Sequence, residues 1–291
     1  MNNIIHQYLA ISLIICVFVL AIITSFAVNI FPLLKLIFLF IKYFNIEIIN
    51  SNKLLNWTYK GVSDYFSHNI IYTENIKNYN FDNKQYIKCL MPHGFVSLSL
   101  VCLRNHKYLN NDLLVTSHQL YNSPLVSLFR DKINMIPAEF SVMDKHLKNN
   151  KNLILYPGGI REKFSCSHKE EVIVINKRKG LFKLAMINGT NILPIYTFGV
   201  SEMYEKSEYE FKLKNGVGLS WYYGLYNTPF PKKVNFLTVV GSPIFVKKKI
   251  NITEKDINNL RDRYKIIIKK LFHKWKSFYN PSWYNKNLIF K

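Results

Sequence analysis

A long apolar segment opens the chain. Residues Gln7–Leu34 contain no Asp, Glu, Lys or Arg. Because a helix of about 20 apolar residues spans the core of a bilayer, this segment predicts a membrane-embedded helix. The pattern fits a single span, or a helical hairpin that turns near Asn29–Pro32 and returns through Ile41–Ile49. A cleaved signal peptide fits less well, since residues 1–6 carry no Lys or Arg.

Beyond this segment, short apolar runs alternate with helical patterns. The runs predict strands at Tyr86–Leu90, Leu113–Thr116, Ile133–Ile136, Leu153–Tyr156, Val172–Ile175, Ile192–Phe198 and Phe236–Val240. Helical spacing predicts helices over Phe95–Leu103, Ser123–Phe129, Val142–Asn149 and Lys179–Ile187. A long amphipathic helix is predicted to begin at Thr253, which has capping-box spacing to Asp256. The alternation predicts one α/β domain that binds its substrate at the strand ends, and residues 205–235 are expected to be rich in loops.

Composition narrows the class of protein. The chain has a formal net charge of +21, and 49% of its residues are hydrophobic, which excludes a disordered protein. The charge fits a solvated lysine surface, or attraction to an anionic membrane or a phosphate-bearing substrate. Nucleic acid would also fit the charge, but no nucleic-acid-binding motif accompanies it. None of the four cysteines has CxxC spacing, so neither a zinc site nor a disulfide framework is predicted.

One histidine is distinguished by its neighbours. His93 follows a predicted strand and lies between Pro92, whose φ is fixed, and Gly94, which permits close approach of a ligand. A lone histidine is more often structural, but this backbone setting favours a functional role. The sequence has no GxSxG elbow, P-loop or dinucleotide fingerprint, so His93 fits a general base that activates a substrate hydroxyl. In a chain with a membrane segment, that hydroxyl is expected to belong to a lipid.

Four blocks of residues occur in an order that is typical of one enzyme family. Met91-Pro92-His93-Gly94 is followed by PLVSLFRD at Pro124–Asp131, YPGGIRE at Tyr156–Glu162 and RKGLFKLA at Arg178–Ala185. The blocks resemble the His-Pro-His-Gly motif, the Pro-to-Arg segment, the plant-like Pro-Gly-Gly-x-x-Glu motif and the longest block of the type 2 diacylglycerol acyltransferase family. That family includes monoacylglycerol and wax-alcohol acyltransferases, and the resemblance extends over Tyr86–Phe278.

The resemblance implies an acyltransferase-type mixed sheet flanked by helices, with a membrane anchor in residues 1–50 and an acyltransferase domain in residues 51–291. It implies that the enzyme moves a fatty acyl group from acyl-CoA to the hydroxyl of diacylglycerol and needs neither cofactor nor metal. His93 would be the general base, and Glu162 would orient it. Substrate binding is expected from Pro92, Gly94, Arg130, Gly158, Gly159, Arg161, Arg178, Lys179 and Lys183. The arginines and lysines among these residues suit the phosphates of CoA.

Two positions depart from the family pattern. Met91 stands where many members have a first histidine. Leu98 stands where the wider acyltransferase superfamily often places an aspartate that pairs with the catalytic histidine. Glu162 is therefore the candidate partner of His93, although an ion pair with Arg178 or Lys179 would explain this glutamate equally well.

Other interpretations of the sequence stay open. The acyl acceptor could be monoacylglycerol, a long-chain alcohol or a lysophospholipid, and a non-catalytic basic membrane-binding protein is a more remote alternative. Lysines beyond the apolar segment predict a cytosolic catalytic domain by the positive-inside rule; they are Lys35, Lys42, Lys53 and Lys60. The resemblance points to the endoplasmic reticulum membrane or lipid droplets. The expected partners are acyl-CoA, a lipid alcohol and the membrane but not nucleic acid, and a homo-oligomer is left open.

Overall fold

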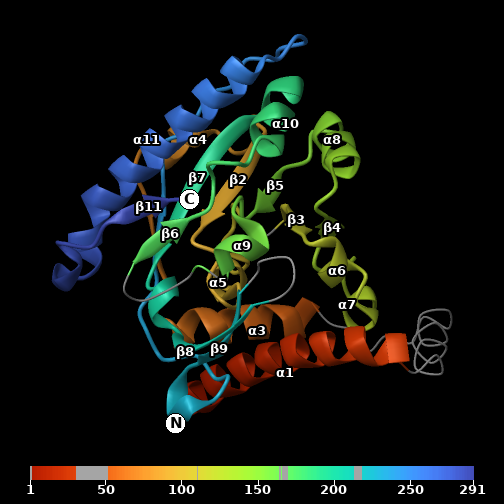
Figure 1. The fold of residues 1–291 in the computed structure, drawn as a ribbon, viewed down its shortest axis with the longest axis vertical. Coiled ribbons are helices and arrows are strands. Elements are labelled where there is room, and N and C mark those ends of the chain that lie inside the picture. Colours follow the sequence, from red (N-terminus) through yellow and green to blue (C-terminus); the bar gives the residue numbers. More distant parts are fainter. Residues whose placement is uncertain (1, 31–51, 110, 164, 166–169, 213–217) are drawn as a thin grey trace.

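A computed structural model describes residues 2–30, 52–109, 111–163, 165, 170–212 and 218–291. Among these residues, the largest sheet has seven strands in the order β1-β10-β7-β2-β5-β3-β4 (Figure 1). The strands are β1 (Asn69–Tyr72), β2 (Tyr86–Met91), β3 (Leu113–Thr116), β4 (Met135–Pro137), β5 (Leu153–Leu155), β7 (Asn191–Phe198) and β10 (Leu237–Val240). The strands from β7 to β4 run parallel, whereas β10 is antiparallel to β7. The mixed sheet implied by the resemblance is therefore confirmed.

Helices cover both faces of the sheet, which explains why its central strands are apolar on both sides. On one face, α8 (Phe140–Lys148), α10 (Gly180–Asn188) and α11 (Glu254–Tyr279) pack through side chains such as Phe182 and Phe272. The other face is covered by α4 (Ile76–Tyr79) and α5 (Leu98–Leu103). The predicted capping box at the start of α11 is confirmed, because Thr253 and Asp256 exchange side-chain to backbone hydrogen bonds. Short helices in the connections are α6 (His118–Tyr121), α7 (Pro124–Ser127) and α9 (Gly159–Lys163).

Two helices near the N-terminus lie side by side along one end of the sheet (Figure 1). They are α1 (Asn2–Ile30) and α3 (Asn52–Tyr65), and Ala10 and Ile11 of α1 are buried in one cluster with Val62 and Tyr65 of α3. No helix within the described residues is both long enough and apolar enough to cross a membrane. The membrane anchor therefore stays a prediction, and the proposed return segment Ile41–Ile49 lies outside the described residues.

Three parts of the secondary structure differ from the sequence prediction. β6 (Glu171–Ile173) is not part of the seven-stranded sheet, because it pairs in parallel with β11 (Leu288–Phe290). The region expected to be loops contains an antiparallel pair, β8 (Glu205–Lys212) and β9 (Gly218–Tyr223). β1 was not predicted either; it is a partly exposed strand that pairs with β10, about 170 positions further along the chain.

Candidate active site

The predicted site residues come together where parallel strands end. β2 lies between β5 and β7 and runs parallel to both, so the carboxyl ends of these three strands share one edge of the sheet. β2 leads into Pro92-His93-Gly94, β5 leads into Pro157-Gly158-Gly159, and β7 leads into Gly199-Val200. The edge thus collects a histidine and two glycine-containing turns that are far apart in the sequence.

Local hydrogen bonding defines the protonation of the His93 ring. His93 Nδ1 lies 2.8 Å from the carbonyl oxygen of Gly94. A carbonyl oxygen can only accept, so Nδ1 carries the proton in this contact. In the neutral ring, Nε2 then holds the lone pair, which is the arrangement that a general base requires.

Gly94 allows the histidine turn to close against the turn that follows β7. Its φ is +67°, in the left-handed region that favours glycine. A Cβ at this position would lie 2.6 Å from Cγ1 of Val200, well inside normal van der Waals contact. Gly94 is therefore required both by its backbone conformation and by the close packing of the turn.

Glu162 holds the main chain of the histidine turn. Its Oε1 accepts the backbone N–H of His93 at 2.7 Å, and its Oε2 accepts the backbone N–H of Val174 at 3.0 Å. The side chain is 1% exposed. Burial raises the pKa of Glu162 to about 7, although the two amide donors and Arg178 act in the opposite direction. Glu162 thus contacts its predicted partner through the backbone amide of the histidine.

Tyr156 contacts the His93 ring and was not singled out from the sequence. The two ring centroids are 4.6 Å apart, with the planes tilted by 45°. The phenol oxygen of Tyr156 lies 2.8 Å from Oγ of buried Ser99 on α5. The aromatic side chain is therefore fixed at its far end and limits the orientations that the histidine ring can take.

The glycine turn after β5 is held by Arg178. The Arg178 guanidinium donates to the carbonyl oxygen of Gly158, and burial lowers the pKa of this arginine. Gly159 has a φ of +57° and begins the short helix α9, which carries Glu162. Arg161, on the same helix, is exposed. Arg178 thus fixes the turn. The alternative of a pairing between Glu162 and Arg178 is represented by an electrostatic attraction that acts to lower the pKa of Glu162.

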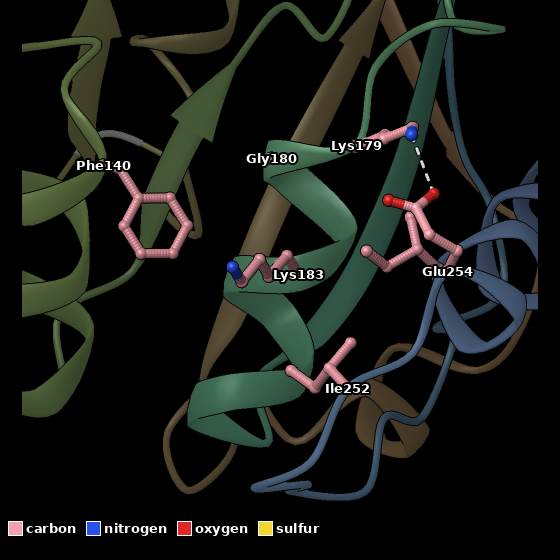
Figure 2. A pocket seen from close by; sticks show the side chains of 7 residues that line it. Phe140, Lys179, Gly180, Lys183, Ile252 and Glu254 are labelled. Carbon is pink, nitrogen blue, oxygen red and sulfur yellow. Dashed lines mark ion pairs between the residues drawn. The ribbon is translucent and has the colours of Figure 1, made fainter.

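Lys179 and Lys183 line a separate cleft of about 430 Å³ at the start of α10. Phe140, Ile252 and Ile257 contribute apolar walls, and Figure 2 shows Lys179 reaching Glu254 at the start of α11. The Lys179 Nζ to Glu254 Oε2 distance is 2.7 Å, and both side chains are more than half exposed. The residues that line the cleft come from α8, from α10 and Lys179 just before it, and from α11 and Ile252 just before it.

Arg130 is placed apart from the other predicted residues. It lies on the β3–β4 connection, where Nη1 donates to the carbonyl oxygen of Tyr121 at 3.1 Å. Its guanidinium also lies over the Tyr121 ring, 4.2 Å from the centroid. The structure therefore groups His93 with the glycine turn, but it gives no contact between Arg130 and that group among the described residues.

An aromatic crevice adjoins the histidine turn. Phe95 stacks on Tyr222 of β9, with ring centroids 4.5 Å apart, and meets Tyr204 edge-on. Val200 and Ser201 complete the crevice. The crevice therefore places apolar side chains next to Gly94.

Comparison with known proteins adds the family to this geometry. The family model described as diacylglycerol acyltransferase matches residues 23–291. The chain belongs to the diacylglycerol acyltransferase family. Family membership confirms the resemblance inferred from the four sequence blocks, and it confirms that the protein is an acyltransferase enzyme.

Individual relatives of the family align over most of the chain. Diacylglycerol O-acyltransferase 2 of Dictyostelium discoideum is 27% identical over 76% of this chain and 73% of its own length. The human protein of the same name is 25% identical over 76% of this chain and 64% of its own length. The chain thus spans less than two thirds of the human relative. Among solved structures, the 1-acyl-sn-glycerophosphate acyltransferase of Thermotoga maritima aligns with this chain. The alignment covers 93% of this chain and 98% of the bacterial chain, with 13% identity and a TM-score of 0.49.

Proposed function

We propose that the enzyme transfers a fatty acyl group from acyl-CoA to the free hydroxyl of diacylglycerol, with His93 as the general base. The observation that carries the proposal is the hydrogen bond from His93 Nδ1 to the Gly94 carbonyl, which leaves the lone pair on Nε2. The family membership and the names of the relatives support diacylglycerol as the acceptor.

The proposed reaction needs no protein nucleophile. Nε2 of His93 takes the proton of the acceptor hydroxyl while the hydroxyl oxygen attacks the carbonyl carbon of the thioester. The carbon–sulfur bond then breaks, CoA leaves as a thiolate, and the imidazolium returns the proton to it. Gly159 N–H already donates to the carbonyl of Tyr156 at 3.1 Å, so the amides of Gly94 and Gly158 are the better candidates to hold the oxyanion.

We assign the two ends of acyl-CoA to two separate parts of the structure. We assign the CoA phosphates to the side of Arg161, Lys179 and Lys183, because ammonium and guanidinium groups bind phosphate oxygens. We assign the acyl chain to the side of Phe95 and Tyr222, whose stacked rings must separate to admit it. Arg178 serves the turn rather than the phosphates in this proposal, and Arg130 remains a candidate for a more distant part of CoA.

Membrane association is part of the proposal, because both lipid substrates partition into bilayers. Its support is the row of exposed apolar side chains along α1, which includes Ile4, Ile5, Leu9, Leu13 and Leu20. The net charge of +21 adds attraction to anionic lipid. We also propose that the enzyme lies in the endoplasmic reticulum membrane or on lipid droplets. Its catalytic domain would face the cytosol.

The test is acyl transfer by membrane fractions that contain the chain, given labelled acyl-CoA and a panel of acceptors. Transfer to diacylglycerol should be fastest, and His93→Ala should lower it about 10²- to 10⁴-fold. His273→Ala is the matched control, because this histidine is exposed on α11. Faster transfer to monoacylglycerol, a long-chain alcohol or a lysophospholipid would replace the acceptor. Activity that survives His93→Ala would refute the mechanism, and salt-sensitive liposome binding without any transfer would favour the non-catalytic alternative.

A further inference from the structure

The C-terminal residues are built into the support of the catalytic turn. β11 pairs in parallel with β6, with Leu288 opposite Glu171 and Phe290 opposite Ile173. The pairing continues past the strand, because the carbonyl oxygen of Lys291 accepts the backbone N–H of Ile175 at 2.8 Å. These bonds lie on either side of Val174, whose own N–H holds Glu162.

A buried carboxylate joins this C-terminal segment to the end of β7. Glu171 of β6 is 2% exposed. Its Oε2 accepts the phenol hydroxyl of Tyr196 at 2.7 Å, and its Oε1 accepts the hydroxyl of Ser201. Lys286 completes the set, with Nζ 3.0 Å from Oε1 and a side chain that is only 10% exposed. Three segments of the chain therefore donate to one carboxylate.

Lys286 is itself fixed by the C-terminal segment. Its ammonium lies over the ring of Trp283, 3.6 Å from the centroid. Trp283 Nε1 donates to Glu202 at 2.9 Å, and Tyr279 donates to the same carboxylate at 2.7 Å. The end of α11 and the segment after it are thus tied twice to the turn that follows β7.

Two structural connections lead from Glu171 to the histidine. The first runs along β6 to Val174, whose N–H binds Glu162, which in turn binds the backbone N–H of His93. The second runs through Ser201 to its neighbour Val200, which packs against Gly94. A shift of β6 or of the turn after β7 would therefore move the histidine turn from two directions.

We infer that Lys286 and Glu171 are positioning residues of acyl transfer, a role that rests on the proposed function of His93. Their buried ion pair fixes β6 and the turn after β7 at the distance that places the His93 ring. Burial of two charges is costly unless both are paired, so the loss of one partner forces the other to move or to draw in water. A displacement of about 1 Å in a catalytic group is enough to lower a rate by up to about 10²-fold.

The kinetic test uses Lys286→Met, which keeps the length of the side chain and removes its charge. We expect kcat to fall about 10-fold or more, while KM for acyl-CoA stays within about two-fold. Lys286→Arg should restore most of kcat. Lys270→Met, on an exposed part of α11, is the matched control and should change neither constant. An unchanged kcat in Lys286→Met, or failure of the arginine to restore it, would overturn the inference.

A second test does not depend on turnover. Amide hydrogen exchange should become faster in Lys286→Met in the peptides that contain His93 and Val174, but not in peptides from β3. Tyr196→Phe removes only the hydroxyl that donates to Glu171. It should produce the same pattern to a smaller extent, and it replaces Lys286→Met in the test if that variant does not fold. Unchanged exchange around His93 in Tyr196→Phe and in folded Lys286→Met would refute the positioning role. If the variants exchange faster than the wild type but the wild type transfers no acyl group, only the proposed function is refuted.

Discussion

The buried Glu162 makes a prediction about how stability depends on pH. Its pKa of about 7 in the folded protein lies above the ordinary value of 4.5. A raised pKa means that the folded state binds the proton more tightly than the unfolded state. The contribution of this group is therefore complete below about pH 4.5 and is lost as the pH rises through about 7. The difference between the two pKa values corresponds to about 3 kcal/mol of unfolding free energy.

Glu162→Gln removes this titration and keeps the size of the side chain. Between pH 4 and 8, the unfolding free energy of the wild type should fall by about 3 kcal/mol relative to the variant. At about 2 °C per kcal/mol for a chain of this size, the difference in Tm should change by about 6 °C. The other titrating groups are present in both proteins and cancel from this difference.

The assay is thermal unfolding in detergent at half-unit steps of pH, followed by intrinsic fluorescence. Glu139→Gln, at an exposed position, is the control and should show no such dependence. A difference between wild type and Glu162→Gln that stays constant would show that Glu162 is ionised throughout. Growth of this difference confined to pH values below about 5 would show that the two amide donors outweigh burial, and either result would refute the argument from desolvation.

Three further predictions concern the neighbours of the histidine. Gly94→Ala should destabilise the protein by about 1–3 kcal/mol and lower kcat, because the new Cβ meets Val200 at a positive φ; normal unfolding and kinetics would contradict this. Glu254→Gln should free Lys179 and lower KM for acyl-CoA by about 2- to 5-fold at low salt, with the gain disappearing at high salt. Tyr156→Leu should reduce kcat more than Tyr156→Phe, since only the leucine removes the ring that packs on the histidine; equal kcat values would count against that packing.

The sequence was most informative where one segment determines its own structure. The apolar run that predicts a strand at Leu113–Thr116 is β3 with the same limits. The capping box at Thr253 also formed as predicted, because its donors and acceptors lie within one turn of helix. The position of His93 after a strand was sufficient to predict a residue at the edge of the sheet.

The interactions that long-range packing creates were beyond such reasoning. The run at Val172–Ile175 has the same apolar character whether it pairs with β7 or with β11, so its removal from the main sheet has no local signal. The contact of Glu162 with a main-chain amide was equally invisible, because the motif shows only a carboxylate 69 positions from His93. Only the folded chain shows that this carboxylate binds the backbone of the histidine turn.

The strand order of the sheet has a consequence for synthesis on the ribosome. β2 is complete at Met91, but its neighbour β7 ends only at Phe198. β1 is made earlier still, but it can pair only after β10 (Leu237–Val240) has been synthesised. A nascent chain therefore carries unpaired strand edges through most of translation, a state that favours association with other chains. A translation product that stops before β7 contains His93 but lacks Val200, against which Gly94 packs, so the histidine turn is completed only after most of the protein has been made.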